Sequence, residues 1–587
     1  MSLTRREFLQ MLAVSSAAGF NFSHGLPLAR AAQPSDPYEL PDFGNVTLMH
    51  FTDCHAQLLP IYFREPNFNI GIGDAVGHPP HLVGEAFLKH YGIAPSSPES
   101  YAFTYLNFEE AARKYGRLGG FAHLATLVNK IRAQRPSRSL LLDSGDTWQG
   151  SATSLWTQGL DMVDACKLLG VDVMTGHWEF TYGMDRVREI VENHLDGHID
   201  FVAQNVRLTE DAQFAEKPAY DLDTGHVFKP YTMREVNGVK VGIVGQAFPY
   251  TTIANPRYLV EDWSFGIREE AAQEVVDSAR GEGAEVVVLL SHNGMDVDLK
   301  MASQLNGVDV ILGGHTHDGM PKPSVVSNSS GKTLVVNSGS NGKFLSVLDL
   351  QVAAGRVADY QFRMLPVFSN LLPADPAMSQ YIDEVRAPFK DKLEQTLATT
   401  ESTLYRRGNF TGTFDQVIVD ALMAVQGSDI AFSPGFRWGT SVLAGEAITL
   451  ERLMDQTGIT YATATLNEMS GETIKVILED IADNLFNPDP YYQMGGDMVR
   501  VGGLKYAIDP SQNIGSRISN LELNGKPLDA TKTYTVAGWA SVNPQPAGKQ
   551  VWDIVSEYLI DKKVIKEVEA NVPAVKGIED NAGYAPV

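Results

Sequence analysis

Short, mostly apolar runs alternate with segments of helical periodicity through the first part of the chain. The runs at 46–51, 140–142, 286–290 and 308–312 have the length of buried strands, and residues 269–280 have the spacing of an amphipathic helix. Strands that alternate with helices in this way are typical of stacked β and α layers. The pattern therefore predicts an α/β fold.

Two segments depart from this alternation and divide the chain. Residues 61–105, rich in Pro, Gly, His and aromatic side chains, interrupt the first β to α passage and are much longer than an ordinary connection. A helix-like segment at about 376–396 is predicted to link two halves, and a helical apolar pattern at 417–425 opens the second half. We expect a catalytic domain at 43–370, a linker helix at 371–399 and a C-terminal domain at 400–587.

Composition and charge narrow the class of protein. The chain has 587 residues, 44% of them hydrophobic, and its sequence shows no apolar run of about 18 residues, the length that spans a bilayer. This predicts a globular protein of two or more domains without a membrane span. The formal net charge of −24 is spread along the sequence, which disfavours a nucleic-acid partner. An anionic substrate would need local positive charge, which bound metal ions can supply.

The first residues resemble a targeting signal rather than part of a fold. Residues 4–10 read Thr-Arg-Arg-Glu-Phe-Leu-Gln, a mildly apolar stretch follows at 11–20, and residues 29–31 read Ala-Arg-Ala. This order matches a twin-arginine signal peptide at 1–31 and predicts export of the folded protein to the periplasm. An amphipathic N-terminal helix is the alternative, which the small residues after the arginine pair disfavour.

The sequence has only two cysteines, Cys54 and Cys166. In an oxidising compartment they could form a disulfide, but Cys54 lies beside a candidate metal ligand and Cys166 lies in a helical pattern at 162–169. We expect two buried free thiols that pack as small hydrophobic side chains.

Side chains that commonly bind metals stand just after the strand-like runs. In a strand alternate side chains share a face, so Asp53 and His55 are predicted to project together while Cys54 points to the other side. The carboxyl ends of strands are where open α/β sheets place their ligands. A lone Asp-x-His is a weak signal, but repetition at successive strand ends favours a metal site. The residues are Asp53, His55, Asp146, His292, His315 and His317.

A resemblance to known families extends this interpretation. Residues 176–183 read Gly-His-Trp-Glu-Phe-Thr-Tyr-Gly and resemble the Gly-Asn-His-Glu-Phe-Asp-Tyr-Gly box of secreted 5′-nucleotidases. Residues 46–350 resemble a calcineurin-type metallophosphoesterase domain, and 400–587 resemble the C-terminal domain of 5′-nucleotidases. Within that superfamily, residues 52–60 and 483–500 are similar to the SoxB thiosulfohydrolase family. The resemblance implies a four-layer αββα metallophosphoesterase domain followed by a smaller α/β 5′-nucleotidase-type C-terminal domain.

The resemblance also implies two divalent cations, with manganese favoured and zinc as the alternative. Such a pair can clamp a tetrahedral oxyanion for in-line displacement. The family box has Asn at the position of His177, and the change exchanges a hard oxygen ligand for a borderline nitrogen. One cation would be held by Asp53, His55, Asp146 and His317, and the other by Asp146, His177, His292 and His315, with Asp146 as the bridge.

The same box lacks the catalytic dyad of the nucleotidases. Trp178 occupies the position of the family's transition-state histidine, and Thr181 that of the aspartate that orients it. Without this dyad an alkoxide leaving group would not be protonated or stabilised. A sulfur leaving group needs less stabilisation, because a thiol has a pKa of about 8.5. Arg437 lies where the family has a substrate-facing arginine loop, so we expect it to hold a sulfonate; an ordinary surface arginine is the alternative. The predicted catalytic set is Asp146, His177, Trp178 and Arg437.

Together these features predict a hydrolase that releases sulfate from a cysteine S-thiosulfonate on a carrier protein in periplasmic thiosulfate oxidation. The family's carrier is a SoxYZ-like protein pair with its cysteine on a flexible arm, so a narrow opening between two domains is expected. A periplasmic 5′-nucleotidase or related phosphoesterase is the main alternative. It would need aromatic side chains that sandwich a base, and Phe486, Tyr491 and Tyr492 are candidates. A non-catalytic, metal-stabilised binding protein is a third interpretation.

Overall fold

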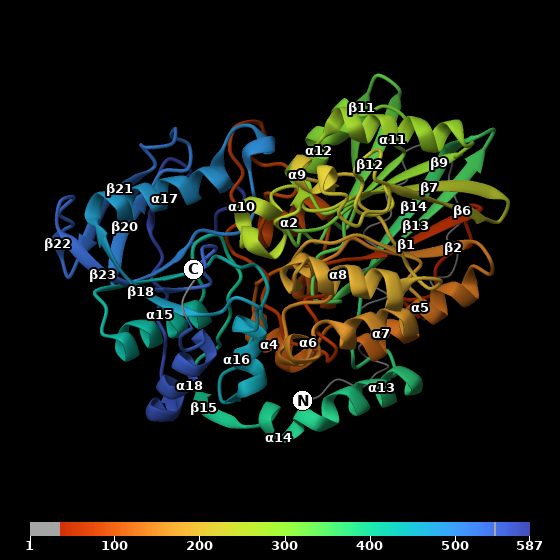
Figure 1. Ribbon diagram of the computed structural model, residues 1–587. Helices are drawn as coiled ribbons and strands as arrows, with labels where there is room; N and C mark the ends of the chain where they lie inside the picture. Colours follow the sequence, from red (N-terminus) through yellow and green to blue (C-terminus); the bar gives the residue numbers. More distant parts are fainter. Residues whose placement is uncertain (1–35, 545–546, 587) are drawn as a thin grey trace.

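The computed structural model describes residues 36–544 and 547–586, which form two domains (Figure 1). The predicted signal peptide at 1–31 lies outside the described residues. Within the described ranges, no helix is both long and apolar enough to cross a membrane.

Two six-stranded sheets form the centre of the first domain. Side chains of both sheets, among them Leu48 and Ile243, meet in one buried layer, so the sheets face each other. The order in one sheet is β14 (Arg356–Pro366), β13 (Phe344–Ala353), β1 (Val46–Phe51), β2 (Ser139–Asp143), β3 (Val173–Met174) and β4 (Asp200–Phe201). The order in the other is β11 (Ser324–Asn328), β12 (Gly331–Asn337), β10 (Val310–Gly313), β9 (Val286–Ser291), β7 (Val239–Gln246) and β6 (Tyr231–Val236).

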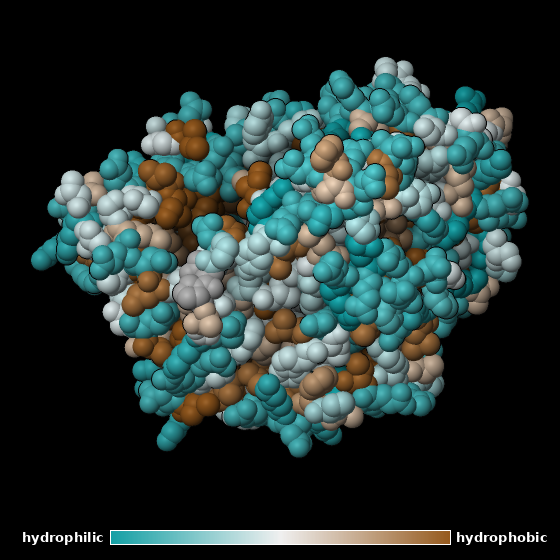
Figure 2. Space-filling model, viewed as in Figure 1, coloured by the Kyte–Doolittle hydropathy of each residue, from teal (hydrophilic) through white to brown (hydrophobic). Residues whose placement is uncertain are grey.

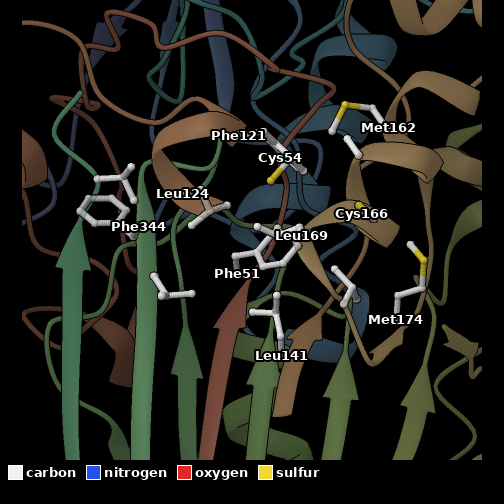
Figure 3. Packing of buried hydrophobic residues seen from close by; sticks show 14 of the residues in the cluster. Phe51, Cys54, Phe121, Leu124, Leu141, Met162, Cys166, Leu169, Met174 and Phe344 are labelled. Atoms are coloured by element: carbon white, nitrogen blue, oxygen red, sulfur yellow. The ribbon is translucent and has the colours of Figure 1, made fainter. Parts of the chain in front are cut away.

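Helices cover the outer face of each sheet. The helices α5 (Phe121–Gln134) and α7 (Leu160–Leu169) pack on the first sheet, as Figure 3 shows from close by. The helices α11 (Glu269–Gly281) and α12 (Met295–Gln304) pack on the second sheet around another buried cluster. The layers therefore follow the order αββα, which confirms the predicted fold class.

Both cysteines lie in the buried layer between the first sheet and its helices. Figure 3 shows Cys54 beside Phe121 and Cys166 near Leu169. Both are free thiols, and burial raises the pKa of each well above its ordinary value. The prediction of two buried free thiols is confirmed, and the high pKa makes both side chains unreactive packing groups.

The second domain is a smaller α/β unit, as predicted. Its first sheet has the order β17 (Ala447–Thr449), β15 (Thr396–Thr400) and β24 (Val564–Ile565). The next sheet has the order β18 (Ala464–Ser470), β23 (Thr533–Trp539), β16 (Ile430–Ser433) and β19 (Arg500–Gly502). A third has the order β22 (Lys526–Pro527), β21 (Ile518–Leu523), β20 (Leu504–Ile508) and β25 (Ala574–Val575). The helices are α15 (Thr413–Gln426), α16 (Leu450–Thr457), α17 (Gly471–Phe486) and α18 (Val551–Lys562).

The junction between the domains is only partly helical. The helices α13 (Pro376–Arg386) and α14 (Lys390–Leu393) occupy much of the segment predicted to be helical at 376–396. Strand β15 then begins at Thr396 and pairs with β17 and β24. The second domain therefore begins inside the range 371–399 that was predicted as a linker helix.

The long segment at 61–105 is ordered and contacts both domains. It carries the helices α2 (Gly84–Tyr91) and α3 (Pro98–Phe103), which pack on the first domain. The ring of Phe68 stacks on Tyr584 of the second domain, with 5.4 Å between the ring centroids. This segment therefore helps to fix one domain against the other.

Candidate metal centre

The candidate ligands stand on loops at the carboxyl ends of β1, β2, β3, β9 and β10. Several have left-handed backbone conformations: φ is 52° at Asp53 and 45° at His55, and it is 57° at Asp146 and 60° at His317. Such conformations cost energy for residues other than glycine, and they concentrate at functional sites. The loops are joined, because the backbone N–H groups of Asp53 and His55 donate to the carbonyls of Gly145 and Asp146.

The predicted backbone of residues 53–55 is wrong. Strand β1 ends at Phe51, so the strand rule of alternating faces does not apply to these residues. The left-handed residues on either side of Cys54 nevertheless turn Asp53 and His55 toward the site, while Cys54 joins the hydrophobic core. The two candidate ligands share a face because of a tight turn rather than a pleat.

Buried side chains converge on two overlapping groups that could each hold a metal ion. Asp146 belongs to both groups. Its Oδ2 lies 2.9 Å from Nε2 of His292 and 3.1 Å from Nδ1 of His177. In the other group, Oδ1 of Asp53 lies 3.2 Å from Nε2 of His317. The groups are Asp146, His177, His292 and His315, and Asp53, His55, Asp146 and His317. These are the sets named from the sequence, and their role as ligands stays a prediction.

The nitrogens of these histidines fit two divalent cations. Nδ1 of His292 donates to the carbonyl of Ser144 over 2.6 Å, so its Nε2 faces the carboxylates and is the nitrogen that could bind a cation. The Nε2 atoms of His55 and His317 lie 3.0 Å apart, and Nε2 of His177 is buried without a hydrogen-bond partner. Buried polar atoms normally have partners, and imidazole with carboxylate suits manganese or zinc. The donor set therefore fits a dinuclear centre.

Burial and the two carboxylates set the protonation of the imidazoles. Burial disfavours a charged ring and lowers the pKa of His55 to about 4, so this ring is neutral, as metal binding requires. Burial also opposes a charge on His292, but the carboxylates of Asp146 and Asp53 outweigh it and raise the pKa of His292 to about 10. Before a cation binds, a proton on His292 therefore offsets part of the negative charge.

A buried carboxylate behind the cluster organises two of its loops. Glu179 accepts the backbone N–H of His177 over 2.8 Å and that of Asp146 over 3.3 Å. It also accepts the N–H groups of Thr147 and Trp148 over 2.7 and 3.2 Å. Glu179 belongs to the box at 176–183, but its role could not be predicted, because nothing local indicates that a carboxylate binds a loop about 30 residues away.

Aromatic rings form the wall where the nucleotidase box has its dyad. The backbone N–H of Trp178 donates to Oδ1 of Asp146 over 2.8 Å. The Trp178 ring packs against Trp438 and Phe436, with 4.8 and 5.1 Å between the centroids. The hydroxyl of Thr181 donates to the carbonyl of Trp178 over 2.7 Å, so this hydroxyl forms a hydrogen bond within the box. Neither Trp178 nor Thr181 can act as the missing imidazole and carboxylate would.

A cavity of about 440 Å³ opens over the cluster and is lined by both domains. His177, His315 and Trp178 line its inner part, and apolar side chains such as Met469 and Trp539 line the part made by the second domain. Figure 2 shows a hollow flanked by hydrophobic residues, in the region where Figure 1 places α10 (Thr251–Ala254) opposite α17. The opening therefore lies between the domains, as expected from the sequence.

Two arginines of the second domain reach the loop that carries His315 and His317. Arg437 lines the cavity, and its Nη1 and Nη2 donate to the carbonyls of Thr316 and Gly496 over 3.2 and 2.7 Å. A guanidinium has five N–H donors, so further donors remain for an anion, and the predicted sulfonate contact stays a prediction. Arg407, which was not predicted from the sequence, also donates to the carbonyl of Thr316, over 3.0 Å.

The aromatic residues proposed for a nucleotide base do not form a clamp among the described residues. Phe486 is buried in the core of the second domain, and the hydroxyl of Tyr491 donates to Glu269. Near the cavity, Phe436 and Trp438 stack directly on each other with 4.1 Å between centroids, which leaves no gap for a base. The expectation of a base sandwich from Phe486, Tyr491 and Tyr492 therefore finds no support in the geometry.

Comparisons with known proteins agree with this architecture. Residues 394–544 match the protein family described as 5′-nucleotidase, C-terminal domain. A 5′-nucleotidase of Bos taurus is 26% identical over 530 residues, which cover 79% of this chain and 86% of that protein. The structure of the sulfate thiohydrolase SoxB of Thermus thermophilus is 36% identical, with a TM-score of 0.85 and coverage of 92% of this chain and 98% of that one. A 5′-nucleotidase precursor of Thermus thermophilus is 25% identical, with a TM-score of 0.70 and coverage of 90% and 99%.

Proposed function

Because the chain belongs to the SoxB family within the 5′-nucleotidase superfamily, and because its catalytic box lacks the dyad, we propose that it hydrolyses a cysteine S-thiosulfonate. The family makes it a hydrolase of metallophosphoesterase type, with buried His and Asp groups that could bind metals. The proposed substrate is carried on a protein cysteine, and the products are sulfate and a protein persulfide.

The reaction adds water across one sulfur–sulfur bond. The water oxygen bonds to the terminal sulfonate sulfur, the bond from that sulfur to the inner sulfur breaks, and the electron pair of that bond stays on the persulfide. The two protons of the water pass to solvent or to the persulfide according to pH. Cations bound at the centre would polarise the water and offset the charge of the sulfonate oxygens.

The observation that supports the proposal is a complete set of candidate metal ligands beside an aromatic wall. A phosphomonoester loses an alkoxide, which needs a proton donor or a positive charge close to the leaving oxygen. A persulfide is a much weaker base and leaves without that help. Trp178 places an apolar ring beside Asp146, and Trp438 and Phe436 pack against this ring. Arg437 supplies N–H donors for the sulfonate from the same cavity.

We further propose the partner, metal and compartment. The cavity is lined by both domains and includes apolar side chains of the second domain such as Met469 and Trp539, which suits an extended arm of a SoxYZ-like carrier protein. Manganese is favoured, with zinc as the alternative, because histidine and carboxylate donors accept both. The twin-arginine pattern at 4–10 supports a periplasmic location.

The proposal is tested with residues 32–587, loaded with manganese, and a carrier protein whose cysteine has been converted to the S-thiosulfonate. Sulfate is measured by ion chromatography, and phosphate release from adenosine monophosphate is measured in parallel. We expect sulfate release, with phosphate release slower by about 100-fold or more, since the missing acid–base dyad is worth about that factor. Rapid phosphate release without sulfate would contradict the proposal and favour the nucleotidase alternative.

A further inference from the structure

The second domain holds the backbone of the loop at 314–318 from across the domain boundary. The carbonyl of Thr316, between the candidate ligands His315 and His317, accepts hydrogen bonds from two arginines. Nη2 of Arg407 lies 3.0 Å from this oxygen, and Nη1 of Arg437 lies 3.2 Å from it. Because both arginines follow β15, the loop position depends on how the second domain is docked.

The ring of His315 is held from the same side. Its Nε2 lies 3.1 Å from the carbonyl of Met494, so Nε2 carries the proton and Nδ1 remains for a cation. The backbone at Gly495 lies so close to the ring of His315 that a Cβ at this position would be 2.2 Å from Nε2. Gly495 also has a φ of +70°, so this contact requires glycine. The second domain therefore sets the orientation of a candidate ligand as well as the loop.

One buried carboxylate fixes these contacts. The Asp497 side chain is fully buried, and its oxygens lie 3.6 Å from Nη1 of Arg407 and 3.4 Å from Nε of Arg437. A third arginine, Arg500, lies 3.1 Å away through Nη2. Burial alone would raise the pKa of Asp497, but the neighbouring arginines outweigh this and lower it, so the carboxylate stays charged. The buried charge keeps both guanidinium groups aimed at Thr316.

We propose that Arg407 and Asp497 are positioning residues of the metal centre, through which docking of the second domain sets the affinity for both cations. Of the two arginines that donate to Thr316, Arg407 is the better one to test. Among the described residues Arg437 lines the cavity proposed to hold the substrate, whereas Arg407 does not. By linkage the effect is reciprocal, so cation binding strengthens the docking. This inference holds whether the substrate is a thiosulfonate or a phosphoester.

The first test replaces Arg407 with methionine, which keeps much of the length of the side chain but removes its donors to Thr316. Dissociation constants for Mn²⁺ alone and Zn²⁺ alone are measured by competition with a fluorescent chelator. We expect the constants to rise about 10-fold or more, the effect typical of an outer-shell partner. Arg407→Lys, which keeps the charge and can still reach the carbonyl, should recover part of the affinity.

Arg517→Met is the matched control. Arg517 is buried in the same domain, pairs with Asp483 at 2.6 Å and donates to the carbonyl of Phe486, but it makes no contact with the loop at 314–318. This change should lower stability and leave the metal constants unchanged. Unchanged constants in folded Arg407→Met, or equal weakening in both variants, would overturn the inference.

A second test uses the unmodified protein and so does not depend on a variant that folds. Amide hydrogen exchange is compared with and without Mn²⁺. Removing the metal should increase exchange at least several-fold in residues 494–500 and 404–410, while strands β20 and β21, which pair with each other, should not change. Unchanged exchange in both segments would overturn the inference whatever the variants show. Neither test measures sulfate release, so failure of the proposed function would leave them interpretable.

Discussion

At the scale of single residues, Asp146 is the side chain on which the centre depends most. Among the described residues it alone belongs to both candidate metal groups, and it also accepts the backbone N–H of Trp178. Asp146→Asn should lower metal content below two ions per chain and reduce turnover at least 100-fold, because a neutral amide holds a bridging position poorly. Elemental analysis and sulfate release on the same preparation measure both effects.

Asp143→Asn serves as the control for this change. Asp143 is also buried at the end of β2 but belongs to neither group, and burial raises its pKa well above the ordinary range. One oxygen of Asp143 accepts the backbone N–H of Gly145 and the hydroxyl of Thr147, and an amide keeps this acceptor, so Asp143→Asn should keep both metal and turnover. Two ions per chain with full activity in Asp146→Asn would contradict the assignment of Asp146.

At the scale of elements, continuous apolar runs located β1, β2, β9 and β10, because strands buried between two layers need apolar side chains on both faces. Strand β3 has only two residues and could not be found in this way. Six candidate ligands could be named because they follow these four strands, and His177, which follows β3, was named from the resemblance of the box at 176–183. The turn that directs Asp53 and His55 toward the site could not be predicted, since a positive φ at residues other than glycine has no reliable sequence pattern.

Contacts made by residues far apart in the sequence were also beyond prediction. The hydrogen bond of Arg407 to Thr316 joins residues 91 positions apart, and the role of Glu179 depends on a loop that precedes it by about 30 residues. Neither residue belongs to a local motif with a fixed spacing to its partner. Strand β15 could not be predicted for a similar reason, because it is a short strand whose partners β17 and β24 come much later in the chain.

Glu179 accepts hydrogen bonds from two loops, one with Asp146 and one with His177, so its replacement should disturb both loops. Glu179→Gln keeps the shape but places an amide N–H₂ against backbone donors, so it should cost about 3 kcal/mol of stability and weaken metal binding. Urea unfolding of the metal-free protein measures the first effect. Glu189→Gln on α8 (Met184–Ile190), where the side chain is 48% exposed, should leave the free energy of unfolding nearly unchanged. Equal effects of the two changes would show that the buried hydrogen bonds of Glu179 contribute little.

At the scale of the whole molecule, metal binding should release protons. Burial opposes a charge on His292, yet Asp146 and Asp53 raise its pKa to about 10, so near neutral pH the metal-free protein holds a proton there that a cation must displace. Because the proton competes with the metal, affinity should fall as the pH is lowered from about 8 to about 6. Calorimetry in buffers of different ionisation enthalpy should detect release of about one proton per chain. Binding without proton release would contradict a role for His292 as a ligand.

The domain arrangement as a whole brings Arg437, an aromatic wall and candidate metal ligands into one cavity. We propose that this arrangement favours a sulfur leaving group because Trp178 and Thr181 replace the dyad. The most direct test compares kcat/KM for sulfate release from an S-thiosulfonate carrier and for phosphate release from adenosine monophosphate. Both are measured in the unmodified protein and in the double variant Trp178→His with Thr181→Asp.

The unmodified protein should prefer the carrier, and the double variant should gain phosphatase activity by about 100-fold, because the restored dyad supplies acid–base catalysis to an alkoxide. Sulfate release should fall in the same variant, since a charged, hydrated pair replaces the packed Trp178 ring. Efficient phosphate release and no sulfate release from the unmodified protein would contradict the account.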